Sequence, residues 1–202
     1  TRFKEPMHLP LVLSPDNSLA EDGSVIGMIK GAKKELLVLQ NSMPTRWGRG
    51  HKKVTSPLVA AVVAAARRGV STRVLLDATF YQLDPLKPDG NDDTVRYLNA
   101  LAAEEGLDLQ ARIIDLETLG LSKIHAKGVM VDGRKTFVGS QNWSENSFRG
   151  NREVGVVIES QKVTSYYRRL FLRDWRYSPQ SRHPLLSAVR LGKRKNKAGA
   201  LV

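Results

Sequence analysis

The sequence predicts an α/β protein whose mixed, mostly parallel β-sheet is flanked by helices on both faces. Helical and strand patterns alternate through the first half of the chain, which is typical of α/β folds. The strands predicted there are continuous apolar runs, as in sheets that are covered on both faces. The 202 residues, 41% of them hydrophobic, suffice for one domain with its own core.

Three helix–strand units make up this first half. In the order helix then strand, they are 24–33 with 35–39, 57–68 with 71–76, and 92–105 with 109–114. Ser56 as N-cap and Gly69 as C-terminal stop delimit the second helix. Asp92 or Asp93 provides a cap for the third helix, and Gly106 ends it.

Two long loops, 41–55 and 79–91, interrupt these units, and long loops often carry function. The first loop interleaves an aromatic residue with basic ones, a composition that suits a polyanion-binding groove. Its candidate groove residues are Arg46, Trp47, Arg49, Lys52 and Lys53. A solvated basic surface without a ligand is the alternative interpretation of this loop.

Strands are denser in the second half of the chain. They are predicted at 124–131, 136–138 and 153–158, and a last helix follows at 163–174. Asp132-Gly133 indicates a tight hairpin turn between the first two of these strands. The aromatic residues of the last helix recur at helical spacing, so we expect them to pack in the core.

Charge and composition restrict the partners. The chain has 32 Lys and Arg against 20 Asp and Glu, a net charge of +12, which favours nucleic acid, anionic lipid head groups or an acidic protein. The alternative is a basic surface without a specific ligand, or charge concentrated in the C-terminal tail. No apolar run approaches the ~18 residues that a spanning helix needs. The absence of cysteine excludes disulfides and a thiol nucleophile, and it fits either redox compartment.

The stretch from Ile124 to Glu153 contains the residues suited to chemistry. His125 and Lys127 are two apart, so on a strand both side chains leave the same face. An imidazole and a positive charge would then address one anionic group, such as a phosphate. Ser140 and Asn142 follow Gly139 and offer neutral hydrogen-bond donors. Taken singly, each of these residues is more often structural or solvent-exposed than functional.

The joint pattern is more specific. It reads HAKGVMVD, TFVGSQNW and NREVGVV, that is His-x-Lys-x4-Asp-x6-Gly-Ser-x-Asn followed by Asn-x-Glu. This pattern resembles the signature of the phospholipase D superfamily, with every spacing kept. The resemblance covers roughly residues 11–177 and is closest in character to the second half of a two-motif prokaryotic member or to a single-motif nuclease.

The resemblance implies a role for each motif residue. His125 would attack phosphorus and form a covalent phosphohistidine, while Lys127 would bind the phosphoryl oxygens. Ser140 and Asn142 would contact the phosphate. Glu153 would accept a hydrogen bond from the other nitrogen of the histidine and fix its tautomer.

The resemblance also implies what is not catalytic and what is missing. Asp132 and Gly139 would be structural, and neither a metal nor a cofactor is expected. A second histidine must protonate the leaving oxygen, yet His8, His51 and His183 lack the motif around them. The missing half would come from a homodimer mate or from an N-terminal domain outside this chain, which begins at Thr1 as an excised or processed product would.

Together these inferences predict a metal-independent phosphodiesterase with nucleic acid preferred as substrate. A phospholipase D or phosphatidyltransferase acting on anionic phospholipid is the first alternative, and a non-catalytic polyanion-binding half-domain is the second. The expected organisation is an N-terminal extension at 1–10, a catalytic domain with one motif at 11–178, and a basic tail at 179–202.

Overall fold

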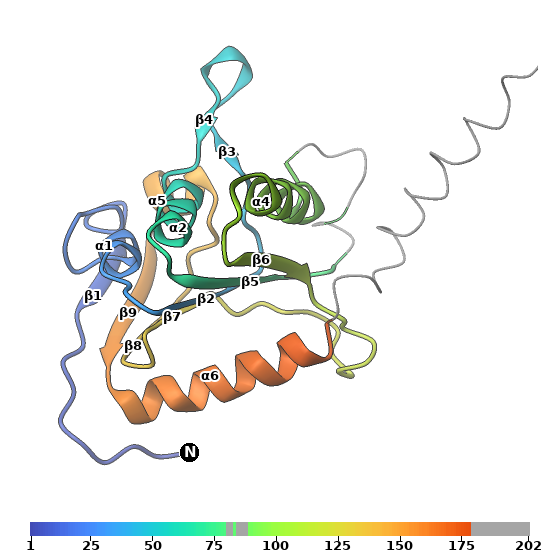
Figure 1. Cartoon of the computed structure of the whole chain (residues 1–202). Coiled ribbons are helices and arrows are strands. Elements are labelled where there is room, and N and C mark those ends of the chain that lie inside the picture. Colours follow the sequence, from blue (N-terminus) through green and yellow to red (C-terminus); the bar gives the residue numbers. More distant parts are fainter. Residues whose placement is uncertain (80–82, 84–88, 179–202) are drawn as a thin grey trace, which may run out of the picture.

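A seven-stranded sheet forms the centre of the computed structural model, which describes residues 1–79, 83 and 89–178 (Figure 1). Its strands follow the order β1-β9-β8-β7-β2-β5-β6. They are β1 (Leu11–Ser14), β2 (Glu35–Gln40), β5 (Ser71–Leu76), β6 (Leu109–Ile113), β7 (Gly128–Val131), β8 (Lys135–Gly139) and β9 (Glu153–Glu159).

The sheet is mixed, as predicted, but antiparallel pairs outnumber parallel ones. Only β2–β5 and β5–β6 are parallel, whereas β1–β9, β9–β8, β8–β7 and β7–β2 are antiparallel. The prediction that parallel pairs dominate is therefore wrong. Helical crossovers join the parallel strands, while β7 and β8 are joined by a tight turn that requires positive φ at Asp132 (53°) and Gly133 (65°).

Helices cover both faces of the sheet, as predicted (Figure 1). One face carries α1 (Val25–Lys30), α2 (Pro57–Arg67) and α4 (Asn91–Glu105), and α6 (Gln161–Arg176) crosses the other. The short α5 (Glu145–Arg149) lies between β8 and β9 in the chain and was not predicted. No helix in the described part of the chain is both long and apolar enough to cross a membrane.

Two apolar clusters fill the space between the sheet and its helices. Side chains of β2 point alternately to the two faces of the sheet. Leu36 and Val38 therefore belong to the larger cluster and Leu37 to the smaller one. On the smaller cluster, Phe171 of α6 is fully buried and its ring stacks on that of Trp175 with centroids 5.8 Å apart. Tyr167 and Trp175 also pack against this cluster, which confirms the prediction for three aromatic residues of the last helix. Tyr166 is half-buried, belongs to neither cluster and contacts the ring of Phe3 instead.

Several predicted boundaries differ from the structure. The predicted loop 41–55 contains a hairpin of β3 (Arg46–Trp47) and β4 (Val54–Thr55), with a 3-10 turn, η1 (Gly50–Lys52), between them. Strand β1 was also not predicted. The Ser56 hydroxyl makes no capping hydrogen bond, and Gly90 rather than Asp92 or Asp93 is the N-cap of α4. Most of the predicted loop 79–91 and the whole tail 179–202 lie outside the described residues.

Candidate active site

The segment that carries His125 and Lys127 precedes β7 rather than belonging to it. The predicted strand 124–131 is regular only from Gly128 onward. His125 is exposed, whereas Lys127 is only 3% exposed. The backbone carbonyl of Lys127 accepts the N–H of Gly139 at 3.2 Å, and its ammonium donates to the carbonyl of His125 at 2.7 Å. A largely buried ammonium is thereby fixed beside a solvent-accessible imidazole.

Electrostatics at this pair favour the neutral imidazole. Lys127 is the main cause that holds the pKa of His125 below its ordinary value, with burial and Lys123 adding to the effect and Asp77 opposing it. Burial likewise lowers the pKa of Lys127, and Lys123 adds to that shift while Glu153 and Asp77 oppose it. A neutral imidazole next to a positive charge is the combination that a nucleophile attacking an anionic phosphodiester needs.

Glu153 begins β9 and accepts hydrogen bonds from two motif neighbours. Ser140 Oγ donates to Oε2 at 2.5 Å and Asn151 Nδ2 donates to Oε1 at 3.0 Å. Burial raises the pKa of Glu153, but these hydrogen bonds and the nearby Lys127 outweigh it and lower the pKa overall. Within the described part of the chain no hydrogen bond joins Glu153 to His125, so the predicted contact is not formed inside one copy.

Gly139 is required by close packing. A Cβ added there would lie 2.3 Å from Gln141 Oε1 and 2.6 Å from the ring of Phe137. Gly155, its partner across β8 and β9, faces the same ring and amide, so this glycine pair makes room for two large buried side chains. Among the described residues, Asn142 Oδ1 is buried without a hydrogen-bond partner.

Asp132 lies at the far end of β7 from His125. Its carboxylate accepts the backbone N–H groups of Lys33, Lys34 and Glu35 at 2.9, 2.7 and 2.9 Å. Burial raises its pKa, but these three hydrogen bonds and the charge of Lys34 outweigh burial, so the pKa is lowered. These contacts hold the start of β2 against the β7–β8 turn, away from the candidate nucleophile.

Three buried polar residues behind His125 were not predicted. Asp77 directly follows β5, Asn41 directly follows β2 and Asn91 begins α4. All three are at most 3% exposed. Asp77 Oδ1 accepts the N–H of Ile124 at 2.6 Å, while Asn41 Nδ2 donates to the carbonyl of Ile124 at 2.9 Å. The one available signal was an aspartate at the carboxyl end of a predicted parallel strand, where ligand sites gather.

The candidate groove residues divide into two groups. Trp47 is only 2% exposed and donates its indole N–H to the Trp143 carbonyl at 3.0 Å, so its ring is not available to stack on a ligand. Lys53 pairs with Asp89 at 2.6 Å. The other three candidates, Arg46, Arg49 and Lys52, are exposed on the β3–β4 hairpin, which projects from the body of the molecule (Figure 1).

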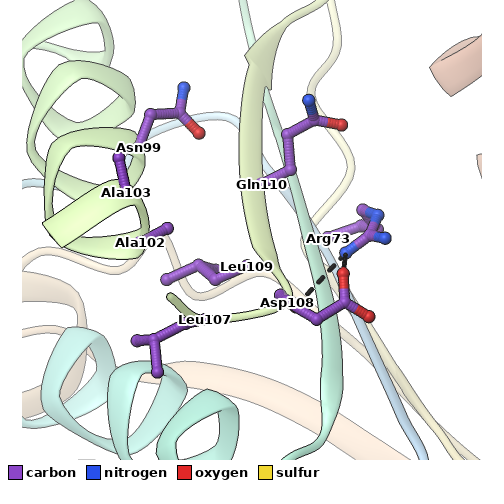
Figure 2. A pocket seen from close by; sticks show the side chains of 8 residues that line it. All are labelled: Arg73, Asn99, Ala102, Ala103, Leu107, Asp108, Leu109 and Gln110. Atoms are coloured by element: carbon purple, nitrogen blue, oxygen red, sulfur yellow. Dashed lines mark hydrogen bonds and ion pairs between the residues drawn. The ribbon is translucent and has the colours of Figure 1, made fainter. Parts of the chain in front are cut away.

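A shallow hollow of about 320 Å³ lies elsewhere, between α4 and β6, and Figure 2 shows its lining. Arg73 and Asp108 form an ion pair of 2.7 Å at its rim. Arg73 lies in the first half of β5, and Asp108 directly precedes β6. Asp77 follows the opposite end of β5, so the hollow and the candidate site lie at different ends of this strand. None of the motif residues lines this hollow.

Comparison with known proteins agrees with this geometry. The family model described as cardiolipin synthase, PLD-like domain, matches residues 25–175. The chain belongs to the phospholipase D superfamily. Its motif residues are therefore placed on a superfamily domain, with His125 and Lys127 entering β7 and Glu153 opening β9.

Relatives within the superfamily differ in their named activities. The chain is 27% identical to the 5'-3' exonuclease PLD4 of Mus musculus over 188 residues, 82% of this chain and 35% of that protein. It is 35% identical to cardiolipin synthase B of Escherichia coli over 92 residues, 45% of this chain and 21% of that protein. The chain thus spans about a third or less of these two curated relatives.

The fold has solved counterparts. The phospholipase D family member Nuc of Salmonella typhimurium superposes with a TM-score of 0.66 at 18% identity. The match covers 88% of this chain and 100% of that one. Likeness at this identity establishes the fold of the superfamily domain.

Proposed function

We propose that this chain supplies one half of a metal-independent phosphodiesterase site that works through a covalent phosphohistidine on His125. The observation that carries the proposal is the buried ammonium of Lys127, fixed beside an exposed imidazole whose pKa is held low. The intact motif in a superfamily domain supports the same assignment.

The proposed reaction has two displacements. In the first, a nitrogen of His125 bonds to phosphorus and the P–O bond to the leaving group breaks, while Lys127 stabilises the charge on the phosphoryl oxygens. Ser140 and Asn142 add neutral donors. In the second, the oxygen of water replaces the histidine nitrogen on phosphorus and releases the phosphoryl product.

A second half-site completes this chemistry. The leaving oxygen needs a proton, and the full His-x-Lys-x4-Asp motif occurs once, at His125, because the His51-x-Lys53 pair lacks the aspartate. The chain thus supplies the nucleophile and no second motif histidine for the acid. Because Glu153 does not contact His125 within one copy, its carboxylate can orient the histidine of the second half. That half belongs either to a second copy of this chain or to an N-terminal domain of a longer protein.

Nucleic acid is the substrate class that we favour. The hairpin exposes Arg46, Arg49 and Lys52, which suits a phosphate backbone, and the net charge of +12 adds long-range attraction. The exonuclease activity named for the mouse relative supports this choice. Trp47 is buried, so the hairpin lacks the exposed aromatic residue that anchors proteins at a membrane interface.

Phospholipid is the alternative substrate, and the likeness to cardiolipin synthase B favours it. Anionic head groups would be attracted by the same basic face. A non-catalytic half that only binds polyanions is a further alternative, but it gives no reason for the charge arrangement around His125.

One experiment separates these functions. The full chain is assayed in EDTA with bis(p-nitrophenyl) phosphate, single-stranded DNA and phosphatidylglycerol vesicles in parallel. Where a second copy of the chain supplies the other half-site, we expect cleavage of the first two substrates and loss of both in His125→Ala. Where an N-terminal domain supplies it, we expect activity only after that domain is added. Loss of activity in EDTA would refute the metal-independent mechanism, and activity that survives in His125→Ala would refute the nucleophile. Cleavage of lipid but not DNA would reverse the substrate choice.

A further inference from the structure

The segment that carries His125 has little strand pairing of its own. Residues 122–127 lie between β6 and β7 in the chain and form no part of the regular sheet. Their position therefore depends on other contacts, and the backbone polar groups of Ile124 make both of theirs with buried side chains. Asp77 accepts its N–H at 2.6 Å and Asn41 donates to its carbonyl at 2.9 Å.

Asn91 ties these two residues to each other. Its Nδ2 donates to the backbone carbonyls of Asn41 at 2.8 Å and of Asp77 at 3.0 Å. Its Oδ1 accepts the N–H of Met43 at 3.2 Å. The ends of β2 and β5 and the start of α4 are thus joined into one hydrogen-bonded unit behind the nucleophile.

Asp77 differs from the two asparagines because it brings a charge. It is fully buried, and its Oδ2 accepts from the N–H of Thr79 at 3.1 Å and from the hydroxyl of Thr79 at 2.5 Å. Within residues 1–79, 83 and 89–178 no ion pair involves Asp77. A buried carboxylate costs several kcal/mol of desolvation unless hydrogen bonds and nearby charges offset it. The positive charges of Lys127 and Lys123 lie on the segment that Asp77 holds.

We propose that Asp77 is a positioning residue for the nucleophile, which holds His125 in place through the backbone of Ile124 and supplies a negative counter-charge behind it. This inference rests on the proposed function of His125. The groups that act on the imidazole are Lys127 and Lys123, which disfavour its protonation, and Asp77, which favours it.

Two substitutions separate placement from charge. Asp77→Asn keeps the size and an oxygen that can accept from Ile124 but removes the charge, whereas Asp77→Ala removes both. We expect Asp77→Ala to lower kcat on bis(p-nitrophenyl) phosphate about 100-fold with little change in KM, since misplacing a reacting group by about 1 Å has an effect of that size. Thr79→Val is the matched control, because it removes a neighbouring hydroxyl and leaves the Asp77–Ile124 contact intact.

The pH dependence of kcat/KM tests whether the negative charge of Asp77 acts on His125. His125 acts as the neutral imidazole, so the rate rises as pH passes its pKa from below. Asp77 raises that pKa, hence Asp77→Asn should lower it and move the acid limb of kcat/KM to lower pH. A residue with a merely structural role would change the melting temperature and the folded fraction without moving this limb.

Two further measurements test the role of Asp77 without using the catalytic rate of its variants. The imidazole pKa of His125, followed by NMR in wild type and Asp77→Asn, needs no activity, so it tests Asp77 even if the proposed function fails. If Asp77 variants do not fold, Asn41→Ala should still lower kcat by removing the other contact to Ile124. An unchanged imidazole pKa in Asp77→Asn, or an unchanged kcat in Asn41→Ala, would overturn the proposal.

Discussion

At the scale of single residues, the site is organised by a charge that is costly to bury. Lys127 is 3% exposed, and the nearby carboxylates of Glu153 and Asp77 favour its charged form against desolvation. A phosphodiester brings a further negative charge to this position, where low local dielectric strengthens the attraction. The same ammonium lowers the pKa of His125 and so disfavours protonation of the imidazole.

Replacing Lys127 should therefore have two effects. We expect Lys127→Met to lower kcat about 100- to 1,000-fold, the range for loss of a donor that stabilises transition-state charge. Because Lys127 is the main cause of the lowered pKa of His125, its removal should raise that pKa and move the acid limb of the pH–rate profile to higher pH. Steady-state kinetics between pH 5 and 8 measure both effects.

Lys123→Met is the control for this prediction. Lys123 is exposed and also lowers the pKa of His125, but it lies outside the His-x-Lys motif. Its removal should move the acid limb in the same direction and leave the plateau rate nearly unchanged. Equal losses of plateau rate in both variants would show that Lys127 acts only through bulk charge.

At the scale of elements, Asp132 links the antiparallel strands β2 and β7. It caps the first N–H groups of β2 from the β7–β8 turn, and this contact fixes the antiparallel pairing of β2 with β7. We expect Asp132→Asn to lower the free energy of unfolding by about 1–3 kcal/mol, as for hydrogen bonds to a charged group. Urea denaturation measures this loss, and Glu117→Gln, at an exposed carboxylate, is the control.

The free energy of unfolding that Asp132→Asn removes should become smaller as the pH falls. The folded pKa of Asp132 is depressed, so its contribution is fully present above the unfolded pKa of about 4 and disappears as pH falls through the folded value. Wild type and Asp132→Asn should thus converge in stability below about pH 4. A constant difference down to pH 2 would contradict the assignment of the charge.

Gly139 provides a second test at this scale. Gly139→Ala would place a methyl group against the Phe137 ring and the Cα of Gly155, 3.0 Å away, so we expect a loss of about 1–3 kcal/mol, typical of overpacking. Gly31→Ala is the control, since its nearest new contact would be 3.4 Å. Thermal unfolding of both variants measures the difference, and equal melting temperatures would contradict the steric account.

Particular elements show what the sequence could predict. Short-range signals were sufficient for β5 and for the Asp132-Gly133 turn, because apolar runs and turn residues act locally. The fixed spacing of His125, Lys127 and Glu153 likewise identified the motif. The Asp77–Ile124 and Asn41–Ile124 contacts join residues 47 and 83 positions apart, and no local pattern encodes them. The burial of Trp47 depends on Trp143, 96 positions away.

At the scale of the whole molecule, hydrogen bonds anchor the hairpin that carries Arg46, Arg49 and Lys52 to the body of the domain. The β3–β4 hairpin is held by the Trp47–Trp143 hydrogen bond and by the Gly48 N–H, which donates to Glu145 at 2.8 Å. Trp143 and Glu145 lie one and three residues after Asn142, the last residue of the Ser140-x-Asn142 motif. The cations of the hairpin therefore have a fixed relation to the candidate phosphate site, whereas a free loop would not.

Removing these cations should weaken binding of DNA without affecting chemistry. We expect the double variant Arg46→Ser/Arg49→Ser to raise KM for single-stranded DNA and to reduce the salt dependence of binding by up to about 0.7 per lost phosphate contact. Turnover of bis(p-nitrophenyl) phosphate should stay unchanged. Lys33→Ser/Arg134→Ser, two exposed cations near Asp132, is the control with the same charge change. An equal rise of KM in both would show that only net charge matters.

The proposed mechanism depends on a covalent bond between a nitrogen of His125 and phosphorus. The direct measurement is mass spectrometry of the chain quenched during turnover of a phosphodiester in EDTA. We predict a phosphoryl adduct on the peptide that contains His125, which is lost on acid treatment and absent from His125→Ala. Turnover without any adduct on that peptide, or an adduct that persists in His125→Ala, would contradict the account.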